Sequence, residues 1–402
     1  MHTIKVVLVG SGGYGKKYAE YLLRESHLHN TLLVAVVDPY ATKSEIYAQL
    51  IEAKIPIFET LEQFYSHMNA DLAVISTPIH LHCEQTCYAV QHGSHVLCEK
   101  PAAPTVEQVK EMIRVRNYWK RTVAVGFQWC YDPAVQRLKE DILSGKFGAA
   151  KRFKCLVLWP RNTAYYNRSL WAGKLKINGQ WVLDSVASNA TAHFLHFMLF
   201  LLGQDMLNSA YPDFVEAELY RANQIESFDT CAMRISTKDV EILFFASHAV
   251  KEKMGPMFEL EFSQAIVYFN HPDFLDSTDS LLVVHRNGTK EIYGAVNHGS
   301  MKKLWDVVDL LKGEKKTYCT LESALSLTLT VNCAHLSSEV VDFPKNLKRI
   351  EGDPPLVWIE DLSKWIRECF NQGKLPSELN LPWARASKKV NSGQCGGVFE
   401  SC

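Results

Sequence analysis

Two motifs in this sequence are suited to redox chemistry on a small molecule. The first is the glycine-rich segment at residues 10–15 (Gly-Ser-Gly-Gly-Tyr-Gly), and the second is Glu99-Lys100-Pro101. Glycines at the G-x-G-x-x-G spacing allow a tight turn and let backbone amides approach a pyrophosphate. The glycine motif therefore predicts a bound dinucleotide. The Glu99-Lys100-Pro101 motif indicates the reaction in which that dinucleotide is used. The predicted cofactor contacts of the loop are Gly10, Gly12, Gly13, Tyr14 and Gly15.

The residues around the glycines predict the strand, turn and helix that such a motif needs. Residues 4–9 form an apolar, β-branched run that leads into the glycines, and residues 16–24 follow with the apolar spacing of a helix. A second apolar run, residues 32–37, ends in Asp38, a carboxylate placed to accept the ribose hydroxyls of a dinucleotide. Because Asp38 would repel a 2′-phosphate, we expect NAD rather than NADP, although Lys43 lies nearby.

Composition excludes several classes of function. A chain of 402 residues can bury a large core and is expected to hold about two domains. The 43 basic and 44 acidic residues, with no polybasic block, give no electrostatic case for binding nucleic acid or an anionic membrane. No apolar run reaches the roughly 18 to 20 residues of a membrane span, and Met1 lies almost directly before the first strand. The scattered cysteines predict reduced thiols in a cytoplasmic protein.

The first third of the chain predicts a doubly wound α/β domain. Apolar runs alternate with helical patterns, which is typical of a parallel sheet with helices on both faces. The expected strands lie at residues 4–9, 32–37, 56–58, 71–76, 95–98 and 123–127. In such sheets the ligand binds outside the carboxyl ends of the strands. The motifs at Gly10, Asp38, 76–78, 99–101 and 128–129 all follow strands, so we expect them to meet in one crevice.

The remainder of the chain predicts a second, α+β domain with a large, mainly antiparallel open sheet. Strand-like runs, several joined by short turns, occur at residues 151–158, 214–219, 230–235, 240–247, 257–262, 265–269 and 280–286. A helix starting at Asp184 or Ser188 and ending at Leu202 is expected to interrupt them, and helices at 301–311 and 321–339 follow. We therefore expect domains at 1–129 and 130–402, with an extension after about residue 344.

Several segments of the sequence resemble the Gfo/Idh/MocA family of pyridine-nucleotide oxidoreductases. The similar segments are Thr77-Pro78 with His82, residues 93–101, 125–133, 145–148 and 320–324, and the likeness continues to about residue 343. The resemblance implies that Thr77, Pro78, His82 and Glu99 border the cofactor. It also implies that Lys100 lies near the nicotinamide and the reacting hydroxyl. On residue chemistry alone, Lys100 could instead be a solvated surface charge.

The family's second catalytic element is a helix that carries D-x-G-x-H-x-x-D. His193 aligns with its histidine, while Asn189 and His196 stand at the aspartate positions. An imidazole titrates near pH 6.5, which suits a base that accepts a hydroxyl proton. The resemblance thus implies that His193 is the base. Because the aspartates are absent, His196 is a candidate to replace His193 or to relay the proton, and Asp184 is a candidate to supply the missing charge. Both histidines could alternatively be residues that pack the helix.

An aromatic loop, residues 159–168 together with Trp171, lies between the Lys100 motif and the His193 helix in the sequence. This aromatic loop is a candidate for substrate contact. Aromatic faces can cover sugar rings while arginine and asparagine side chains bind hydroxyls, although such a cluster can also form a core or an oligomer contact. The substrate candidates are Trp129, Arg161, Tyr166, Arg168, Lys174, Asp184, Asn189 and His193, and His248 is expected to border the pocket. No zinc site is expected, because the histidines lack a matching set of ligands.

These observations predict an NAD-dependent oxidoreductase that transfers a hydride between nicotinamide and a secondary hydroxyl of a sugar, glycoside or cyclitol. Lys100 and His193 would handle the proton. Two other functions stay open: an NAD-dependent glycosidase that oxidises a sugar transiently, and a nucleotide-sensing regulator without turnover. We expect a homo-oligomer, a dimer or tetramer, that assembles through the open sheet.

Overall fold

A computed structural model describes residues 3–238, 240–274, 279–296, 301–397 and 399. The chain forms two compact units, which are described separately. The first contains residues 1–103, 107–131 and 298–325, and the second contains residues 104–106, 132–297 and 326–402. Residues 298–325, which the sequence analysis placed in the second domain, thus belong to the first unit.

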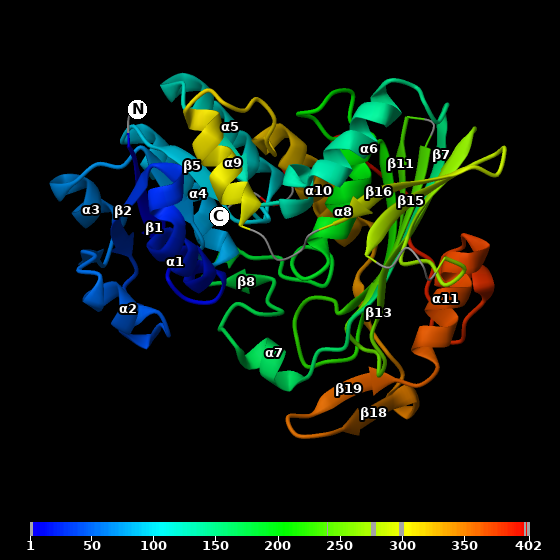
Figure 1. The fold of residues 1–402 in the computed structure, drawn as a ribbon. Helices are drawn as coiled ribbons and strands as arrows, with labels where there is room; N and C mark the ends of the chain where they lie inside the picture. Colours follow the sequence, from blue (N-terminus) through cyan, green and yellow to red (C-terminus); the bar gives the residue numbers. More distant parts are fainter. Residues whose placement is uncertain (1–2, 239, 275–278, 297–300, 398, 400–402) are drawn as a thin grey trace. The chain divides into compact units, whose positions relative to one another are not determined.

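The first unit is built on a six-stranded parallel sheet in the order β3-β2-β1-β4-β5-β6 (Figure 1). This is the doubly wound order of dinucleotide-binding sheets, so the predicted architecture is confirmed. The strands are β1 (Ile4–Val9), β2 (Thr31–Val37), β3 (Ile57–Phe58), β4 (Leu72–Ile75), β5 (His95–Cys98) and β6 (Val123–Val125). The helices along this part of the chain are α1 (Tyr14–Glu25), α2 (Tyr47–Glu52), α3 (Leu61–His67), α4 (His82–Gln91) and α5 (Val106–Trp119). Apart from Lys5 near the start of β1, the central strands β1 and β4 are apolar, because helices cover both faces of the sheet.

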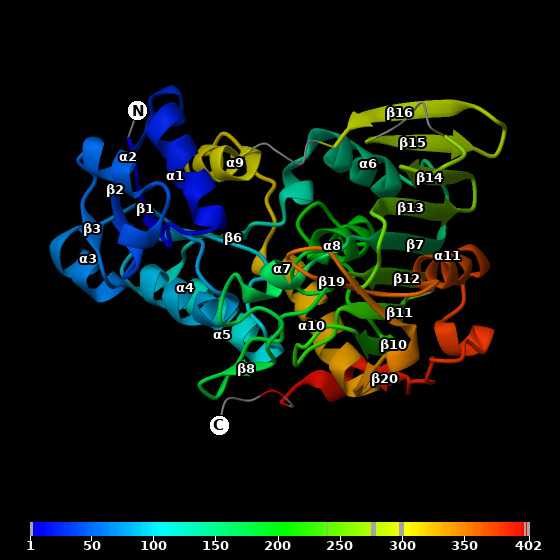
Figure 2. The same ribbon diagram turned by 90° about the horizontal axis from the view of Figure 1, so that it is seen from below.

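Helix α9 (Lys302–Leu311) completes the first unit although it lies far along the chain. Figures 1 and 2 show it beside α1. The Trp305 indole donates to the Glu25 carboxylate at 3.1 Å, and its ring stacks on His29 with centroids 3.9 Å apart. The segment after α9 bonds to β6, because the Val125 amide donates to the Cys319 carbonyl at 2.9 Å. These contacts hold residues 301–325 against the parallel sheet.

The second unit contains a ten-stranded mixed sheet, as predicted mainly antiparallel (Figure 2). Its order is β16-β15-β14-β13-β7-β12-β11-β10-β17, with β20 paired to β10, and the parallel pairs are β7 with β12 and β10 with β17. The strands are β7 (Ala150–Leu158), β10 (Phe214–Arg221), β11 (Thr230–Thr237), β12 (Val240–Ser247), β13 (Met254–Phe262), β14 (Ala265–Phe269), β15 (Ser280–His285), β16 (Lys290–Ala295), β17 (Val340–Asp342) and β20 (Val390–Asn391).

Helices and two small hairpins accompany this sheet. The helices are α6 (Pro133–Leu143), α7 (Thr163–Asn167), α8 (Ala192–Leu201), α10 (Leu321–Ser337) and α11 (Leu362–Gln372). The hairpins are β8 (Lys176–Ile177) with β9 (Gln180–Trp181), and β18 (Lys348–Glu351) with β19 (Leu356–Ile359). Among the described residues, no helix has the length and apolar character needed to cross a bilayer.

The predicted start of helix α8 at Asp184 or Ser188 is wrong, because the helix begins at Ala192. Serine side chains hold the preceding residues in a different conformation. The Ser185 hydroxyl accepts from the Ser188 amide at 3.1 Å, and the Ser188 hydroxyl donates to the Leu183 carbonyl at 2.8 Å. Such side-chain bonds compete with helical backbone bonds.

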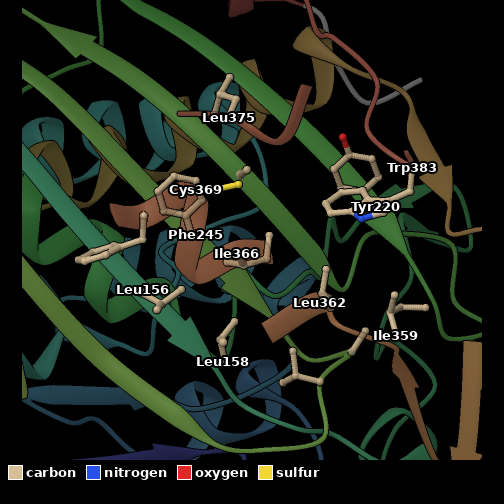
Figure 3. Close-up of a cluster of buried hydrophobic side chains, with 14 of the residues drawn as sticks. Leu156, Leu158, Tyr220, Phe245, Ile359, Leu362, Ile366, Cys369, Leu375 and Trp383 are labelled. Carbon is tan, nitrogen blue, oxygen red and sulfur yellow. The ribbon is translucent and has the colours of Figure 1, made fainter. Parts of the chain in front are cut away.

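A C-terminal segment, residues 344–395, covers one face of the large sheet; we call it the C-terminal cover. Figure 3 shows its apolar side chains packed against strand residues such as Leu156, Leu158 and Phe245. The cover contributes Ile359, Leu362, Ile366, Cys369, Phe370, Leu375 and Trp383. The sheet is therefore not open at β7 and β10–β13, and an oligomer contact through the sheet would have to use β14–β16.

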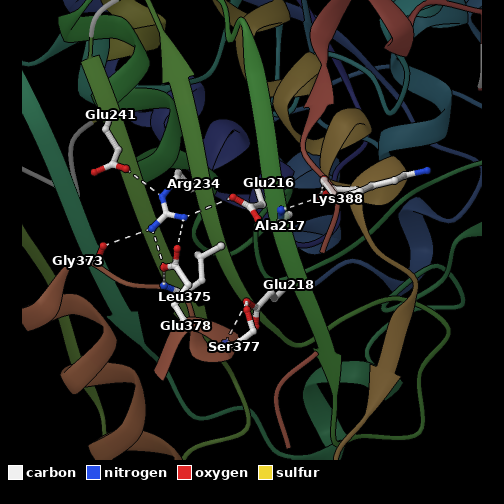
Figure 4. Close-up of polar contacts among 11 residues, drawn as sticks. Glu216, Ala217, Glu218, Arg234, Glu241, Gly373, Leu375, Ser377, Glu378 and Lys388 are labelled. Carbon is white, nitrogen blue, oxygen red and sulfur yellow. Dashed lines mark hydrogen bonds and ion pairs between the residues drawn. The ribbon is translucent and has the colours of Figure 1, made fainter. Parts of the chain in front are cut away.

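Polar contacts also attach the cover to the sheet (Figure 4). The Arg234 guanidinium on β11 forms a bidentate pair with the Glu378 carboxylate, with N···O distances of 2.8 and 2.7 Å. Its Nε also donates to Glu241 at 2.9 Å. Parallel N–H···O bonds of this kind fix geometry as well as adding energy. Arg234 therefore ties strand β11 to the part of the cover that follows α11.

One cysteine prediction is wrong. Cys333 on α10 and Cys395 near the end of the cover form a disulfide, with a sequence separation of 62 residues. The other described cysteines are free thiols, as expected. The sequence could not reveal the pair, because only the folded cover brings Cys395 to α10.

Replacing Ile366 by alanine tests whether the cover is an integral part of the fold. Ile366 is 1% exposed, and a buried isoleucine cut to alanine typically costs about 2 to 5 kcal/mol of unfolding free energy. We expect a clear fall in Tm by scanning calorimetry. The matched control is Ile350→Ala, whose side chain is 70% exposed and should leave Tm almost unchanged. Equal Tm values for the two variants would contradict the packing described.

Candidate dinucleotide and substrate sites

In the glycine loop, a Cβ at two positions would collide with a backbone oxygen, whereas two other positions face open space, and one of these, Gly13, has a positive φ of 52° that favours glycine. A Cβ on Gly15 would lie 2.0 Å from the Gly10 carbonyl oxygen, and one on Gly10 would lie 2.5 Å from the Ser76 carbonyl oxygen. A Cβ on Gly12 or Gly13 would meet no atom within 4 Å. The first pair therefore enforces the close turn between β1 and α1. The second pair leaves room beside the backbone, as a bound pyrophosphate requires.

Asp38 is tied to the same loop. Its Oδ2 accepts hydrogen bonds from the Ser11 amide at 2.8 Å and the Ser11 hydroxyl at 2.7 Å. Its Oδ1 accepts from the Tyr40 amide at 2.8 Å. A carboxylate offers about four lone-pair sites, so Asp38 keeps capacity for further hydroxyl donors. Lys43, the cation noted in the sequence, places its ammonium 5.2 Å from the Tyr40 ring centroid.

His82 joins the loops that follow β4 and β5. Its ring is 2% exposed, with Nδ1 2.9 Å from the Pro101 carbonyl and Nε2 2.9 Å from the Thr77 carbonyl. Burial lowers the pKa of His82. The Thr77 hydroxyl donates to Gln85 at 2.6 Å. These contacts give His82 a bracing role between two strand ends, whereas its predicted contact with a cofactor stays a prediction.

Glu99, the first residue of the second motif, is a buried carboxylate with three donors around it. The Tyr18 hydroxyl on α1 donates to Oε1 at 2.7 Å, and the Lys303 ammonium on α9 donates to the same oxygen. The Lys100 amide donates to Oε2 at 3.1 Å. Burial alone would raise the pKa of Glu99, but the positive charge of Lys303 outweighs it and holds the pKa below its ordinary value. Glu99 is therefore an anion in the interior of the first unit.

Sequence reasoning missed Lys303, which is 1% exposed. One signal was present: Lys303 is four positions from the buried Val307, so both lie on the apolar face of α9.

Lys100, a predicted catalytic residue, is half-buried just after the end of β5. Trp129, a predicted substrate residue, is 2% exposed, so it offers a ligand little surface in this conformation.

In the second unit, Asp184 and Asn189 lie together immediately before α8. Asp184 is buried, and it accepts from the Gly173 amide at 2.6 Å and from the Asn189 side-chain amide at 2.8 Å. Asn189 does not lie on the same helix as His193 and His196, because α8 begins only at Ala192. Asp184 does not lie at the helix start either.

The two candidate histidines of α8 have different surroundings. His193, its second residue, is half-buried. His196 is 1% exposed, with Nε2 3.5 Å from the Ser209 hydroxyl and its ring stacked near Phe200. The burial of His196 favours the packing alternative for that residue, while His193 keeps the exposure that a base needs.

The aromatic loop after β7 gathers cations over rings. The Arg168 guanidinium lies 3.8 Å from the Tyr165 ring centroid, and that of Arg161 lies 5.0 Å from it. Tyr165 also contacts the ring of His248, with centroids 5.6 Å apart. Lys174 instead forms a half-exposed ion pair with Glu226 at 2.8 Å. The structure thus groups Arg161, Arg168 and His248, and it leaves Lys174 in a surface pair.

Several buried polar atoms in this region have no hydrogen-bond partner among the described residues: Arg161 Nε and Tyr166 Oη in the loop after β7, and His248 Nε2 directly after β12. The Nδ1 of His248 is 2.8 Å from the Trp159 carbonyl, so it carries the proton and Nε2 carries the lone pair. Burial lowers the pKa of His248 to about 3, which keeps the ring neutral. Unpaired buried polar atoms are costly, so a group of them is typical of a site that a polar ligand completes.

The fold and the dinucleotide loop have clear counterparts among known proteins. Residues 4–127 match the family GFO_IDH_MocA, described as an oxidoreductase family with an NAD-binding Rossmann fold. This part of the chain is therefore similar to the NAD-binding domain of that family. The matched residues contain the glycine loop, Asp38 and the Glu99-Lys100-Pro101 motif.

Curated relatives match a part of the chain. An inositol 2-dehydrogenase from Burkholderia lata is 24% identical over 213 residues, which are 52% of this chain and 58% of the relative. A D-glucoside 3-dehydrogenase from Escherichia coli is 27% identical over 146 residues, which are 36% of this chain and 40% of the relative. The chain thus matches less than two thirds of the length of these relatives.

Solved structures resemble the chain over more of its length. A WlbA dehydrogenase from Bordetella pertussis, in complex with NADH and UDP-GlcNAcA, has a TM-score of 0.67 at 21% identity, covering 83% of this chain and 96% of its own. The UDP-N-acetylglucosamine 3-dehydrogenase GnnA from Acidithiobacillus ferrooxidans has a TM-score of 0.65 at 19% identity, covering 84% and 98%. At this identity the likeness shows the fold.

Alanine substitutions in the loop should separate the glycines that shape it from those that face open space. Gly15→Ala forces a Cβ into a backbone oxygen, so we expect a loss of about 3 kcal/mol or more of unfolding free energy. Gly12→Ala should change stability by less than about 0.5 kcal/mol and weaken binding of NAD+ as a probe at least tenfold. Calorimetry and NAD+ titration measure the two effects. A destabilised Gly12→Ala that binds NAD+ normally would refute this division.

Proposed function

We propose that the protein is an NAD-dependent oxidoreductase that transfers a hydride between the nicotinamide and a secondary hydroxyl of a sugar, glycoside or cyclitol. The observation that carries the proposal is the glycine loop, in which Gly12 and Gly13 face open space beside Asp38. The family match over residues 4–127 supports NAD as the cofactor. The glycine loop fits the pyrophosphate of NAD, because no side chain caps the N-terminus of α1 and this end of a helix attracts phosphate oxygens.

The catalytic residues proposed are Lys100 and His193. When bound, NAD supplies the hydride acceptor, and the protein has to bind the substrate and remove its hydroxyl proton. The Lys100 ammonium would stabilise the negative charge that develops on the substrate oxygen. A neutral His193 would accept the proton, because its partial exposure gives it access that the buried His196 lacks.

The aromatic loop of the second unit supports a substrate rich in hydroxyls. The lone pair of His248 Nε2 can accept from a hydroxyl, while the Tyr166 hydroxyl and Arg161 Nε can donate. Two relatives are named for inositol and for a glucoside, which are both polyhydroxylated rings. We therefore propose Arg161, Tyr166, Arg168 and His248 as substrate contacts.

The setting proposed for this activity is the cytoplasm, with the protein as a homo-oligomer that binds no nucleic acid. The free thiols on both units support a reducing compartment, while the Cys333–Cys395 pair is an exception to it. Because the C-terminal cover occupies β7 and β10–β13, we place the proposed subunit contact at β14–β16.

A substrate screen with the full chain tests the proposal. Free sugars, alkyl and aryl glycosides and inositols are incubated with NAD+ or NADP+ while absorbance at 340 nm is followed. We expect NADH formation with at least one polyol, and a higher kcat/KM with NAD+, because Asp38 repels a 2′-phosphate. Release of an aryl group without net NADH would favour the transient-oxidation glycosidase. NAD+ binding without any turnover would favour the regulator.

The pH dependence of two histidine variants tests the assignment of the base. If His193 must be neutral, kcat/KM for oxidation rises with pH through an apparent pKa between about 6 and 8. His193→Ala should remove this limb and lower kcat at least a hundredfold. His196→Ala should keep the limb and lower Tm, because His196 is buried. An unchanged pH profile in His193→Ala would point to Lys100 as the proton acceptor.

A further inference from the structure

We propose that Lys303 is a positioning residue for the proposed reaction: it holds the Glu99 carboxylate in place and, through it, the backbone of Lys100. The inference rests on the proposed function, because Lys100 has its catalytic role there. Lys303 itself is not proposed to touch the substrate or the reacting atoms of the cofactor. It lies on α9, far along the chain from the motif that it supports; Lys303 and Glu99 are 204 positions apart.

The contacts of Lys303 join three segments of the first unit that border the dinucleotide loop. Its ammonium pairs with Glu99 at the end of β5 and donates to the Gly126 carbonyl after β6 at 3.3 Å. It also lies 4.4 Å from the ring centroid of Tyr14, which belongs to the glycine motif, and 5.3 Å from that of Tyr18. Lys303 is therefore placed where the glycine loop, the Lys100 turn and the end of β6 come together.

Glu99 needs a cation because bulk water reaches little of its carboxylate. Its side chain is 10% exposed, and that of Lys303 is 1% exposed. The backbone at Gly126 packs tightly against the carboxylate, since a Cβ there would lie 2.9 Å from Glu99 Oε1. Removing one partner of a buried ion pair leaves an uncompensated charge. A carboxyl group in that situation takes up a proton instead of remaining ionised.

Protonation of Glu99 would disturb Lys100 directly. An ionised carboxylate can accept from the Tyr18 hydroxyl and the Lys100 amide together, as it does here at 2.7 and 3.1 Å. A protonated carboxyl group carries an O–H donor of its own and has fewer acceptor sites. The Lys100 amide would then lose or weaken its partner, and the turn that carries the catalytic ammonium would move. Lys303 thus affects catalysis through Glu99.

A charge-rescue experiment on the full chain tests this inference. The variants are Lys303→Met, Glu99→Gln and the double variant, with Lys100→Met as the reference for lost catalysis and Lys110→Met, an exposed lysine on α5, as the control. Lys303→Met should lower kcat at saturating NAD+ at least tenfold and weaken NAD+ binding at least tenfold. The double variant should recover part of both losses, because the neutral amide introduced by Glu99→Gln needs no cation. A packing role alone would give no such rescue.

The pH dependence of Tm gives a readout that does not need turnover. In the natural protein the pKa of Glu99 is low, so its contribution to stability is present at neutral pH and lost as pH falls. In Lys303→Met the pKa of Glu99 should rise above its ordinary value, so the protein should be most stable at acidic pH and lose stability between roughly pH 5 and 8. The double variant should lack this loss.

The outcomes separate this inference from the proposed function. If the natural protein turns over and Lys100→Met does not, full kcat in Lys303→Met overturns the positioning role. If no polyol turns over, the proposed function fails, and NAD+ binding with the pH dependence of Tm decides the role of Lys303. If Lys303→Met does not fold, the double variant is compared with Glu99→Gln. A double variant that binds NAD+ less well than Glu99→Gln overturns the inference.

Discussion

The buried carboxylate of Glu99 joins several segments of the first unit. Glu99 lies at the carboxyl end of β5, where the parallel strands place their functional residues, and it is ionised in an interior that penalises charge. The Tyr18 hydroxyl from α1 and the Lys303 ammonium from α9 offset that penalty. The Glu99–Lys303 pair is thus one of the contacts, together with that of Trp305 with Glu25, that join α9 to the first unit. The motif around Lys100 is completed only when α9 is in place.

The second unit is organised by a different constraint, the need to bury an apolar sheet face. The C-terminal cover supplies α11 and Trp383 to that face, and the Arg234–Glu378 pair fixes its position. Beyond β7 and β12, the chain turns into the aromatic loop and His248. Polar side chains, some of whose atoms lack hydrogen-bond partners among the described residues, thus lie at the ends of β7 and β12. The other residues of these strands are held in the core. Rigid strands of this kind are suited to holding substrate contacts in a defined geometry.

Sequence reasoning succeeded where the determinants are local. The strand, turn and helix around Gly10–Gly15, the acidic residue after β2 and the six parallel strands all follow from short patterns, and the structure confirms them. It failed where a partner lies far along the chain. Lys303 pairs with Glu99, and Cys395 with Cys333, only after folding brings them together. The start of α8 was missed for another reason: bonds from Ser185 and Ser188 outweigh the apolar helical pattern.

In the proposed reaction a hydrogen moves from a ring carbon to the nicotinamide without exchange with water, so following that hydrogen tests the proposal. The full chain is incubated with NAD+ and with myo-inositol or methyl glucoside deuterated at every ring carbon, and the reduced cofactor is analysed by mass spectrometry. We expect NADH that carries one deuterium at C4 of the nicotinamide. Cofactor that contains no deuterium after the carbohydrate has been transformed would contradict it.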